Sequence, residues 1–358
     1  MIKKSSVILV PRINNPGGVA NYYKSIKLFL NSQIIYIERG KKNRELIPKL
    51  RIISDYFQYL KIVLRNPGIL SVTVNTSLGI GGCLRDGLFL LITPKSIKKI
   101  TFFRGWDPEF QEKIDNSKFL KKWVRKTFLK ADHIIVLSSR FKEKLIQWGY
   151  DKGISLETTL VDETMLNGFD IKNKHLNTNN ILFLSAITRS KGIFESLDAF
   201  HLLQKKKPEI MFQIAGDGSA MPDVNEKINK NEIMGVNILG YVKGEQKAEA
   251  YKNAGIFLFP SYHEGMPNAV LEAMAFGLPV ITTRVGGLPD FFEDGKMGLF
   301  LNNHNPGHIA EKIEYLLERP ELMKQMSEYN YRYAKERFYA GKVAKRLEII
   351  IESVALES

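Results

Sequence analysis

Short apolar runs alternate with longer amphipathic stretches along nearly the whole chain of 358 residues. A run of four or five apolar residues suits a buried strand, so this alternation predicts helices packed on parallel β-sheets. A polar stretch at residues 170–180 interrupts the pattern once, and a chain of this length can form two hydrophobic cores. We therefore expect an α/β protein with two domains.

The apolar runs give the expected strands. In the first half of the chain they are residues 7–10, 34–37, 70–74, 100–103 and 134–137. In the second half they are residues 181–184, 211–214, 237–239, 256–259 and 280–282. The expected organisation is a first domain at 1–168, a linker at 169–180, a second domain at 181–335 and a C-terminal helical segment at 336–358.

One expected helix, residues 45–65, has apolar side chains at spacings of three or four residues. This spacing predicts one apolar stripe, which would face a core, and a basic remainder. The stripe consists of Leu46, Leu50, Ile53, Phe57, Leu60 and Leu64.

Positive charge is concentrated in the first half of the chain. Residues 1–165 contain 29 Lys and Arg against 14 Asp and Glu, whereas residues 166–358 are nearly neutral. The first domain should therefore have an electropositive surface. A nucleic-acid-binding protein would also be basic, but its cations should interleave with exposed aromatic residues in a recognisable module, and no such module is present.

Cys83 is the only cysteine, which excludes an internal disulfide and fits a reducing compartment. The run Val7–Val10 is too short for the apolar region of an export signal, and the run at 88–92 is too short to span a bilayer. We expect a cytoplasmic protein, or one that is peripheral at the cytoplasmic face of a membrane.

Two carboxylates flank the start of a helix at the end of the expected strand 256–259. Pro260 ends this strand, Glu264 lies in the following loop, and Glu272 lies inside a helix that ends at Gly277. The amides near Asn268–Val270 have no intrahelical acceptor and carry the positive end of the helix dipole, so they could hold a diphosphate.

This segment resembles the E-x7-E motif of family 4 glycosyltransferases, the group 1 glycosyltransferases. The match includes the flanking sequences 264–268 and 271–280, and it continues through Gly286-Gly287-Leu288-Pro289 and Asp294-Gly295. The resemblance implies the GT-B architecture, in which two Rossmann-like domains face each other across a cleft and a C-terminal helix, here within residues 336–358, crosses back to the first domain. It also implies that Glu264 contacts the donor sugar and that Glu272 binds the ribose hydroxyls.

Three other loops resemble donor-binding loops of the family. Gly17-Gly18 follows the first strand, Ser185–Gly192 contains Lys191 for the diphosphate, and Gly216-Asp217-Gly218 corresponds to a turn near the nucleotide base. The usual family arginine is replaced by Ala186, which leaves Arg189 as a displaced substitute.

The loop at 102–107 departs from the family pattern, because Arg104 stands where many members have a histidine. Arg104 could bind an acidic acceptor or a phosphate, or it could form a structural salt bridge. Asp107 could orient an acceptor, or it could cap the segment that follows.

The resemblance, together with the departing loop at 102–107, gives three kinds of candidate site residue. The catalytic residues are Glu264, Lys191 and Asp107, and the acceptor-side residues are Arg104 and Asp107. The donor-binding residues are Gly17, Gly18, Arg189, Lys191, Gly216, Asp217, Gly218, Glu264, Gly265, Met266, Pro267, Asn268, Ala269 and Glu272.

The implied activity is retaining transfer of a sugar from a nucleotide diphosphate donor to a glycan or lipid-linked acceptor, in assembly of cell-surface polysaccharide such as lipopolysaccharide. The sequence has no Asp-x-Asp and no cluster of His and carboxylates, so we expect neither a metal nor another cofactor. A phosphorylase of the same architecture and a non-catalytic family member are the alternatives.

Two basic segments in the first domain suggest a further partner. One contains Lys49, Arg51 and Lys61, and the other has Lys118, Lys121, Lys122, Arg125, Lys126 and Lys130 around Trp123. Cations beside an interfacial aromatic residue suit docking on an anionic bilayer, where an acceptor on a lipid carrier would be found. The alternative is a solvated basic face.

Overall fold

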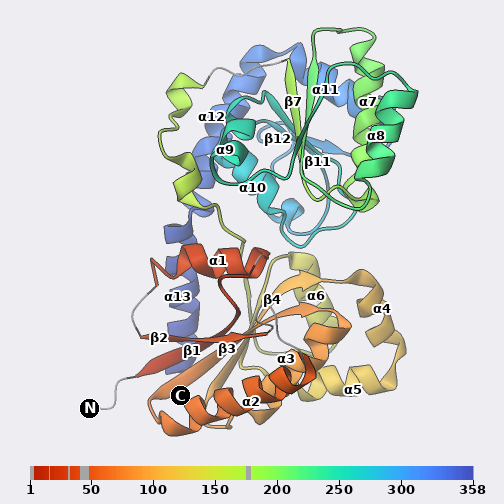
Figure 1. Cartoon of the computed structure of the whole chain (residues 1–358). Helices are drawn as coiled ribbons and strands as arrows, with labels where there is room; N and C mark the ends of the chain where they lie inside the picture. Colours follow the sequence, from red (N-terminus) through yellow and green to blue (C-terminus); the bar gives the residue numbers. More distant parts are fainter. Residues whose placement is uncertain (1–3, 16, 31–32, 41–47, 175–178, 358) are drawn as a thin grey trace. The chain divides into compact units, whose positions relative to one another are not determined.

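The computed structural model describes residues 4–15, 17–30, 33–40, 48–174 and 179–357, and within these ranges the side chains of all but residues 48–50. The chain divides into two compact units. Unit 1 is Met1–Thr159 with Ala340–Ser358, and unit 2 is Leu160–Tyr339. Each unit contains one six-stranded parallel sheet with helices on both faces, so the expected α/β class is confirmed (Figure 1).

The sheet of unit 1 has the strand order β2-β1-β3-β4-β5-β6. Its strands are β1 (Ser5–Pro11), β2 (Ile34–Arg39), β3 (Ile69–Leu78), β4 (Lys98–Trp106), β5 (His133–Val136) and β6 (Gly153–Leu156). Its helices are α1 (Gly18–Ile26), α2 (Pro48–Arg65), α3 (Ile80–Ile92), α4 (Pro108–Asn116), α5 (Lys118–Lys126), α6 (Ser139–Gln147) and α13 (Ala340–Leu356). Helices α2, α3 and α5 cover one face of the sheet, and α1 and α13 cover the other (Figure 1).

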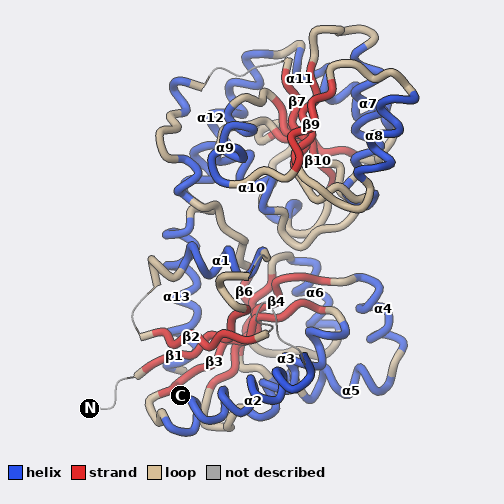
Figure 2. Tube along the Cα trace, in the orientation of Figure 1, coloured by secondary structure: helices blue, strands red, loops and turns tan. Residues whose placement is uncertain are grey.

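The sheet of unit 2, whose strands are red in Figure 2, has the strand order β12-β11-β10-β7-β8-β9. Its strands are β7 (Asn180–Leu184), β8 (Met211–Ala215), β9 (Val236–Gly240), β10 (Ile256–Phe259), β11 (Val280–Thr283) and β12 (Gly298–Leu301). Its helices are α7 (Ile193–Gln204), α8 (Met221–Lys230), α9 (Gly244–Lys252), α10 (Asn268–Ala275), α11 (Pro306–Leu317) and α12 (Pro320–Arg337). Helices α7, α8 and α11 lie on one face of this sheet, and α9, α10 and α12 lie on the other.

The ten expected strands are all present, but two edge strands, β6 and β12, were not expected. Strand β6 has only two apolar residues, Ile154 and Leu156, and none of its residues is buried, so it has no buried-strand pattern. Strand β12 is buried but contains only three apolar residues after Gly298. Strand β4 also extends to Trp106, which places Arg104 within a strand rather than a loop.

Of the apolar stripe predicted for residues 45–65, Leu60 packs against the core, whereas the described residues at both ends of the stripe do not. Helix α2 instead turns Tyr59 and Val63 into the core, and the Tyr59 hydroxyl is 2.5 Å from Thr93 Oγ1. Ile53, Phe57 and Leu64 of the predicted stripe are exposed. A tyrosine can occupy a core position when its hydroxyl has a partner, and apolar spacing alone does not reveal this. Residues 45–47, and the side chain of Leu50, lie outside the described residues.

Helix α13 belongs to unit 1, where it packs on α1 and on strands β3 and β4. Arg346 of α13 forms a two-pronged ion pair with the buried Glu157, with Nη2 2.9 Å from Oε2 and Nε 3.1 Å from Oε1. The fixed geometry of such a pair holds α13 in register on the unit.

The polar stretch expected to be a linker is packed against unit 2 where it is described. The ring of Phe169 lies 5.0 Å from that of Phe276. Lys174 Nζ donates to the carbonyls of Tyr251, Lys252 and Ala254 at the C-terminal end of α9. The boundary between the units therefore lies earlier than the expected one, between residues 159 and 160.

Candidate active site

The order of strands in unit 2 reverses between β7 and β10, and ligands of open α/β sheets bind at the carboxyl ends of strands at such a point. The loops after these two strands are joined there. Tyr262 N donates to Ser190 O at 2.9 Å, and Ser261 Oγ donates to the same carbonyl at 3.4 Å. These contacts bring two sequence segments that are about 70 residues apart into one candidate site.

Lys191 and Glu264, one from each loop, form an ion pair at the centre of this site. Lys191 Nζ is 2.6 Å from Glu264 Oε1, and the two side chains are 22% and 12% exposed. The second oxygen of Glu264 has no hydrogen-bond partner among the described residues. The pair thus presents a cation and a carboxylate oxygen together.

Glu272 is the fifth residue of α10 and is only 7% exposed. Its Oε2 accepts a hydrogen bond from the Tyr251 hydroxyl at 2.9 Å and pairs with Lys247 Nζ at 2.5 Å. Burial and the nearby Glu272 charge raise the pKa of Tyr251 well above its ordinary value, so this hydroxyl stays protonated and donates. Oε1 of Glu272 has no partner within the described part of the chain, which leaves it able to accept from hydroxyls.

The N-terminus of α10 offers fewer amides than the sequence suggested. Val270 N donates to Pro267 O at 3.1 Å, so only the amides of Asn268 and Ala269 remain without a partner among the described residues. Pro267 is the N-cap and supplies no side-chain cap. Asn268 Oδ1 is buried and has no hydrogen-bond partner among the residues that the structure describes. A ligand with hydrogen-bonding groups could satisfy these polar groups at the start of α10.

Glycines allow the surrounding loops to pack closely. Gly216 has φ +134°, and a Cβ there would lie 1.8 Å from Ser185 O, while a Cβ on Gly218 would lie 2.4 Å from Ile187 O. A Cβ on Gly286, at φ +56°, would lie 2.2 Å from Gly265 O. The Gly-Asp-Gly turn and the loop after β11 therefore support the two loops that carry Lys191 and Glu264.

Gly216→Ala should destabilise unit 2 strongly, because it adds a backbone clash to a positive φ that alone costs about 1–3 kcal/mol. Gly295→Ala is the matched control, since Gly295 also has positive φ (+79°) but no atom lies within 4 Å of the added Cβ. Thermal unfolding should show a clearly larger loss of Tm for Gly216→Ala. Equal losses of Tm in the two variants would mean that the clash with the neighbouring loop adds nothing to the cost of the positive φ.

Arg189 does not join the pair of Lys191 and Glu264. Its guanidinium lies 2.5 Å from Asp223 of α8 and over the ring of Phe194, at 4.6 Å from the centroid. It is 73% exposed and lines a separate surface depression. The structure therefore gives Arg189 a partner on α8 instead of the role of the missing family arginine.

The remaining predicted site residues lie on unit 1. Gly17 is the N-cap of α1 with φ +150°, and Gly18 is its first residue. Asp107 is the N-cap of α4, and its Oδ1 accepts from the amides of Glu109 at 3.0 Å and Phe110 at 3.2 Å. Of the two roles considered for Asp107, the structure shows the cap, and the orientation of an acceptor stays a prediction.

Arg104 is held between two aromatic rings. Its guanidinium carbon is 3.7 Å from the centroid of Tyr22 and 4.3 Å from that of Phe102. Its Nε and Nη1 are buried and have no hydrogen-bond partner, and no carboxylate of the described residues forms a salt bridge with it. The structural salt bridge considered for Arg104 is therefore not formed within the described residues.

Two residues of the site, Lys247 and Tyr251, were not anticipated from the sequence. They are four residues apart on α9 and thus share one face, but that spacing alone does not show that the face meets Glu272. The described residues contain no group of three or more His, Cys, Asp or Glu side chains that could hold a metal ion.

Comparison with known proteins finds a family match for the second part of the chain. Residues 167–333 match the family model described as "Glycosyl transferases group 1". The chain is 27% identical over 247 residues to the uncharacterized glycosyltransferase MJ1178 of Methanocaldococcus jannaschii, covering 69% of this chain and 66% of the relative. It is 26% identical over 230 residues to the capsular polysaccharide biosynthesis glycosyltransferase CapM of Staphylococcus aureus, covering 63% of this chain and 60% of the relative. The chain thus matches less than two thirds of the length of these relatives.

A solved structure shows the same fold over almost the whole chain. HepE of Anabaena, crystallised with UDP, superposes with a TM-score of 0.73 at 14% identity, covering 98% of this chain and all of that one. The GT-B architecture expected from the sequence is thereby confirmed.

Proposed function

Because residues 167–333 match the group 1 glycosyltransferase model, we propose that this chain is a member of that family and transfers a sugar from a nucleotide diphosphate donor to a glycan or lipid-linked acceptor. The observation that carries the proposal is the meeting of Lys191 with Glu264 at the carboxyl ends of β7 and β10, with Glu272 on the adjacent helix. In this assignment Lys191 and the free amides of α10 bind the diphosphate, Glu264 contacts the donor sugar, and Glu272 accepts from the ribose hydroxyls.

The chemistry that fits these residues is retaining transfer without a dedicated protein base. The bond from the anomeric carbon to the diphosphate breaks, and the acceptor oxygen bonds to the same face of that carbon. The acceptor proton passes to an oxygen of the leaving diphosphate. Lys191 and the helix amides would stabilise the negative charge that develops on this leaving group, so no metal ion or cofactor is required in this proposal.

The biological setting that we propose is assembly of a cell-surface polysaccharide. Support comes from the name of the relative CapM, which refers to capsular polysaccharide, and from a 32% identical stretch of 178 residues in a putative teichuronic acid biosynthesis glycosyltransferase of Bacillus subtilis, TuaC. That second match covers 43% of TuaC.

A donor screen tests the proposal. UDP, GDP and their sugars are added to the chain in chelator, and the shift in Tm identifies the base and the sugar together, since a ligand that binds only the folded state raises Tm. UDP is a suitable first probe because the fold relative HepE was crystallised with it. The configuration of the product, read by proton NMR, should match that of the donor. An inverted product, or activity that the chelator abolishes, would refute the mechanism.

On unit 1 we propose that Arg104 receives an anionic group of the acceptor, because no carboxylate of the described residues pairs with it and its aromatic stacking fixes its direction. Arg104→Gln should lower kcat/KM at least about tenfold for an acceptor with a carboxylate or phosphate, since a hydrogen bond to a charged group is worth about 1.5–3 kcal/mol. An otherwise identical neutral acceptor should be much less affected. Equal losses for both acceptors would reject the proposal.

A further inference from the structure

Helices α2, α3 and α5 present exposed apolar side chains on the side away from the sheet of unit 1. We call this surface the α2–α3–α5 face. Its apolar members are 42–70% exposed and consist of Ile53, Phe57 and Leu64 on α2, Ile80, Leu84 and Leu91 on α3, and Phe119 on α5. Spacings of four, seven and eleven residues place those of α2 on one side of that helix and those of α3 on one side of theirs. No helix in the described part of the chain is long and apolar enough to span a membrane.

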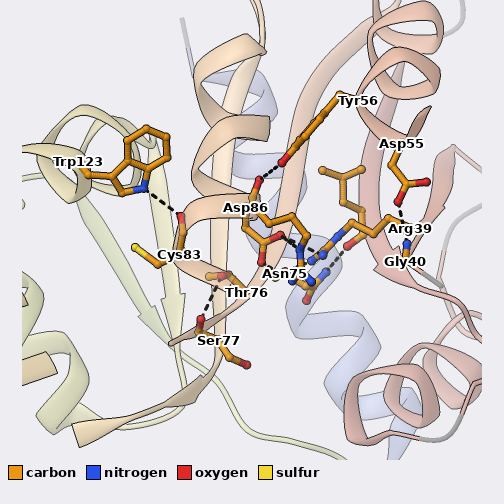
Figure 3. A network of polar contacts seen from close by, with 12 residues as sticks. Arg39, Gly40, Asp55, Tyr56, Asn75, Thr76, Ser77, Cys83, Asp86 and Trp123 are labelled. Atoms are coloured by element: carbon orange, nitrogen blue, oxygen red, sulfur yellow. Dashed lines mark hydrogen bonds and ion pairs between the residues drawn. The ribbon is translucent and has the colours of Figure 1, made fainter. Parts of the chain in front are cut away.

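Polar contacts hold the three helices together as one surface. The Tyr56 hydroxyl of α2 donates to Arg85 O of α3 at 2.9 Å, and Trp123 Nε1 of α5 donates to Cys83 O of α3 at 3.0 Å (Figure 3). A Cβ on Gly87 would lie 2.9 Å from Trp123 Nε1, so α3 and α5 are closely packed. Trp123 is therefore an internal contact and not the interfacial aromatic that the sequence suggested. Phe57 and Phe119 are the exposed aromatic side chains of the face.

Every exposed charge among the described side chains of these helices is positive. The exposed cations are Lys61, Arg65, Lys118, Lys121, Lys122, Arg125 and Lys126. The two acidic residues, Asp55 and Asp86, point inward and are buried (Figure 3). Asp86 pairs with Arg39 at 3.0 Å and with Arg85 at 2.7 Å, and Asp55 accepts from the amide of Gly40 at 2.8 Å. The inward network thus leaves no exposed negative charge on the described side chains of α2, α3 and α5, although Asp115 of the neighbouring α4 lines one depression with Lys121 and Arg125.

An apolar surface of this kind on a folded chain indicates a binding partner, and the surrounding charges indicate which one. A second copy of the same face would bring like charges together. A nucleic acid would pair with the cations but would leave the aliphatic side chains of α2 and α3 in water. An anionic bilayer offers both phosphate groups for the cations and a hydrocarbon boundary for the apolar side chains.

We propose that the α2–α3–α5 face docks on an anionic lipid bilayer. The apolar side chains of α2 and α3 would enter the headgroup region, and the cations of α5 would contact anionic headgroups. The inference deepens the proposed function, because a lipid-linked acceptor would be presented at that surface. Docking nevertheless requires no catalysis and can be measured separately.

Flotation of the full chain with vesicles tests the proposal. One set of vesicles contains phosphatidylglycerol and phosphatidylcholine, and the other contains phosphatidylcholine alone. Binding should be strong to the anionic set at low salt and weak to the neutral set. It should fall as salt rises, because screening shortens the range of the attraction. Equal recovery with both sets would overturn the proposal.

Variants separate the two contributions to docking. Changing Lys121, Lys122, Arg125 and Lys126 to Glu should lower partitioning at least about a hundredfold, because each of the four cations near an anionic surface contributes about fivefold. The matched control changes four exposed lysines of unit 2, Lys205, Lys230, Lys324 and Lys335, to Glu and thus alters the net charge equally. This control should retain most of its binding.

The combined change of Phe57, Leu64 and Ile80 to Ser should lower partitioning about tenfold or more without altering its dependence on salt. If only the cations bound the bilayer, these three changes would leave partitioning unchanged. That outcome would overturn the role of the apolar side chains. Sedimentation of the free chain gives a second check, since a dimer dispersed by the same three changes would identify a second copy as the occupant. Binding of UDP, or of whichever nucleotide the donor screen selects, should be unchanged in every variant, so a failure of docking would be distinguishable from a failure of the donor site.

Discussion

Glu264→Gln is expected to lower turnover by about 10²–10³-fold, the range for removing one group that stabilises a transition state. Glu264 lies against Lys191 at the point where the donor sugar would meet its diphosphate. The amide keeps the size of the side chain but removes its charge, so positive charge that develops on the sugar loses its nearest carboxylate. Nucleotide affinity should be retained, because the same change frees the Lys191 ammonium from its ion pair.

Glu272→Ala provides the contrast, because Glu272 is assigned to the ribose. Loss of this carboxylate should weaken the binding of the nucleoside and of the nucleotide sugar alike. The expected loss of binding free energy is about 1.5–3 kcal/mol, the value of a hydrogen bond to a charged group. Steady-state kinetics and calorimetry on both variants check the division of roles. The exposed Glu328 supplies a control carboxylate on the same unit. Equal small effects of Glu264 and Glu272 on turnover and binding would defeat the assignment.

Lys191→Ala is expected to weaken binding of a nucleoside diphosphate by about 1.5–3 kcal/mol, or about 10- to 150-fold in Kd. The variant removes the ammonium and also leaves Glu264 without its cation, so the diphosphate would meet an unpaired carboxylate. The bare nucleoside carries no such charge and should bind nearly as well as to the unaltered chain.

The ratio of the two affinities is the informative quantity for Lys191, because it is independent of general damage to the fold. Lys324→Ala, which removes an exposed ammonium from α12, should leave both affinities unchanged. A parallel loss of nucleoside and nucleoside diphosphate binding in Lys191→Ala would show that Lys191 is structural.

The parts of the site that follow strand ends could be predicted from the sequence. Pro260 ends a buried strand, and Gly277, in a left-handed conformation, ends the helix that carries Glu272, so local chemistry fixes where both carboxylates lie. The joining of Lys191 with Glu264 required one further step, the rule that carboxyl ends of parallel strands meet at one edge of the sheet.

Features that depend on packing between distant elements could not be predicted. Lys247 and Tyr251 reach Glu272 because α9 lies beside α10, and Arg189 turns away because α8 offers Asp223. The orientation of α2 depends on a hydroxyl partner for Tyr59 that is 34 residues away. Periodicity is a property of one segment and does not specify what that segment packs against.

The most direct test of the central claim is calorimetric titration, in chelator, of the nucleoside diphosphate selected by the donor screen into the unaltered chain, Lys191→Ala and Glu272→Ala. We predict one binding event on the unaltered chain and a Kd that is at least about tenfold weaker in each variant. Binding of the same affinity in all three proteins would contradict a donor site built from these residues.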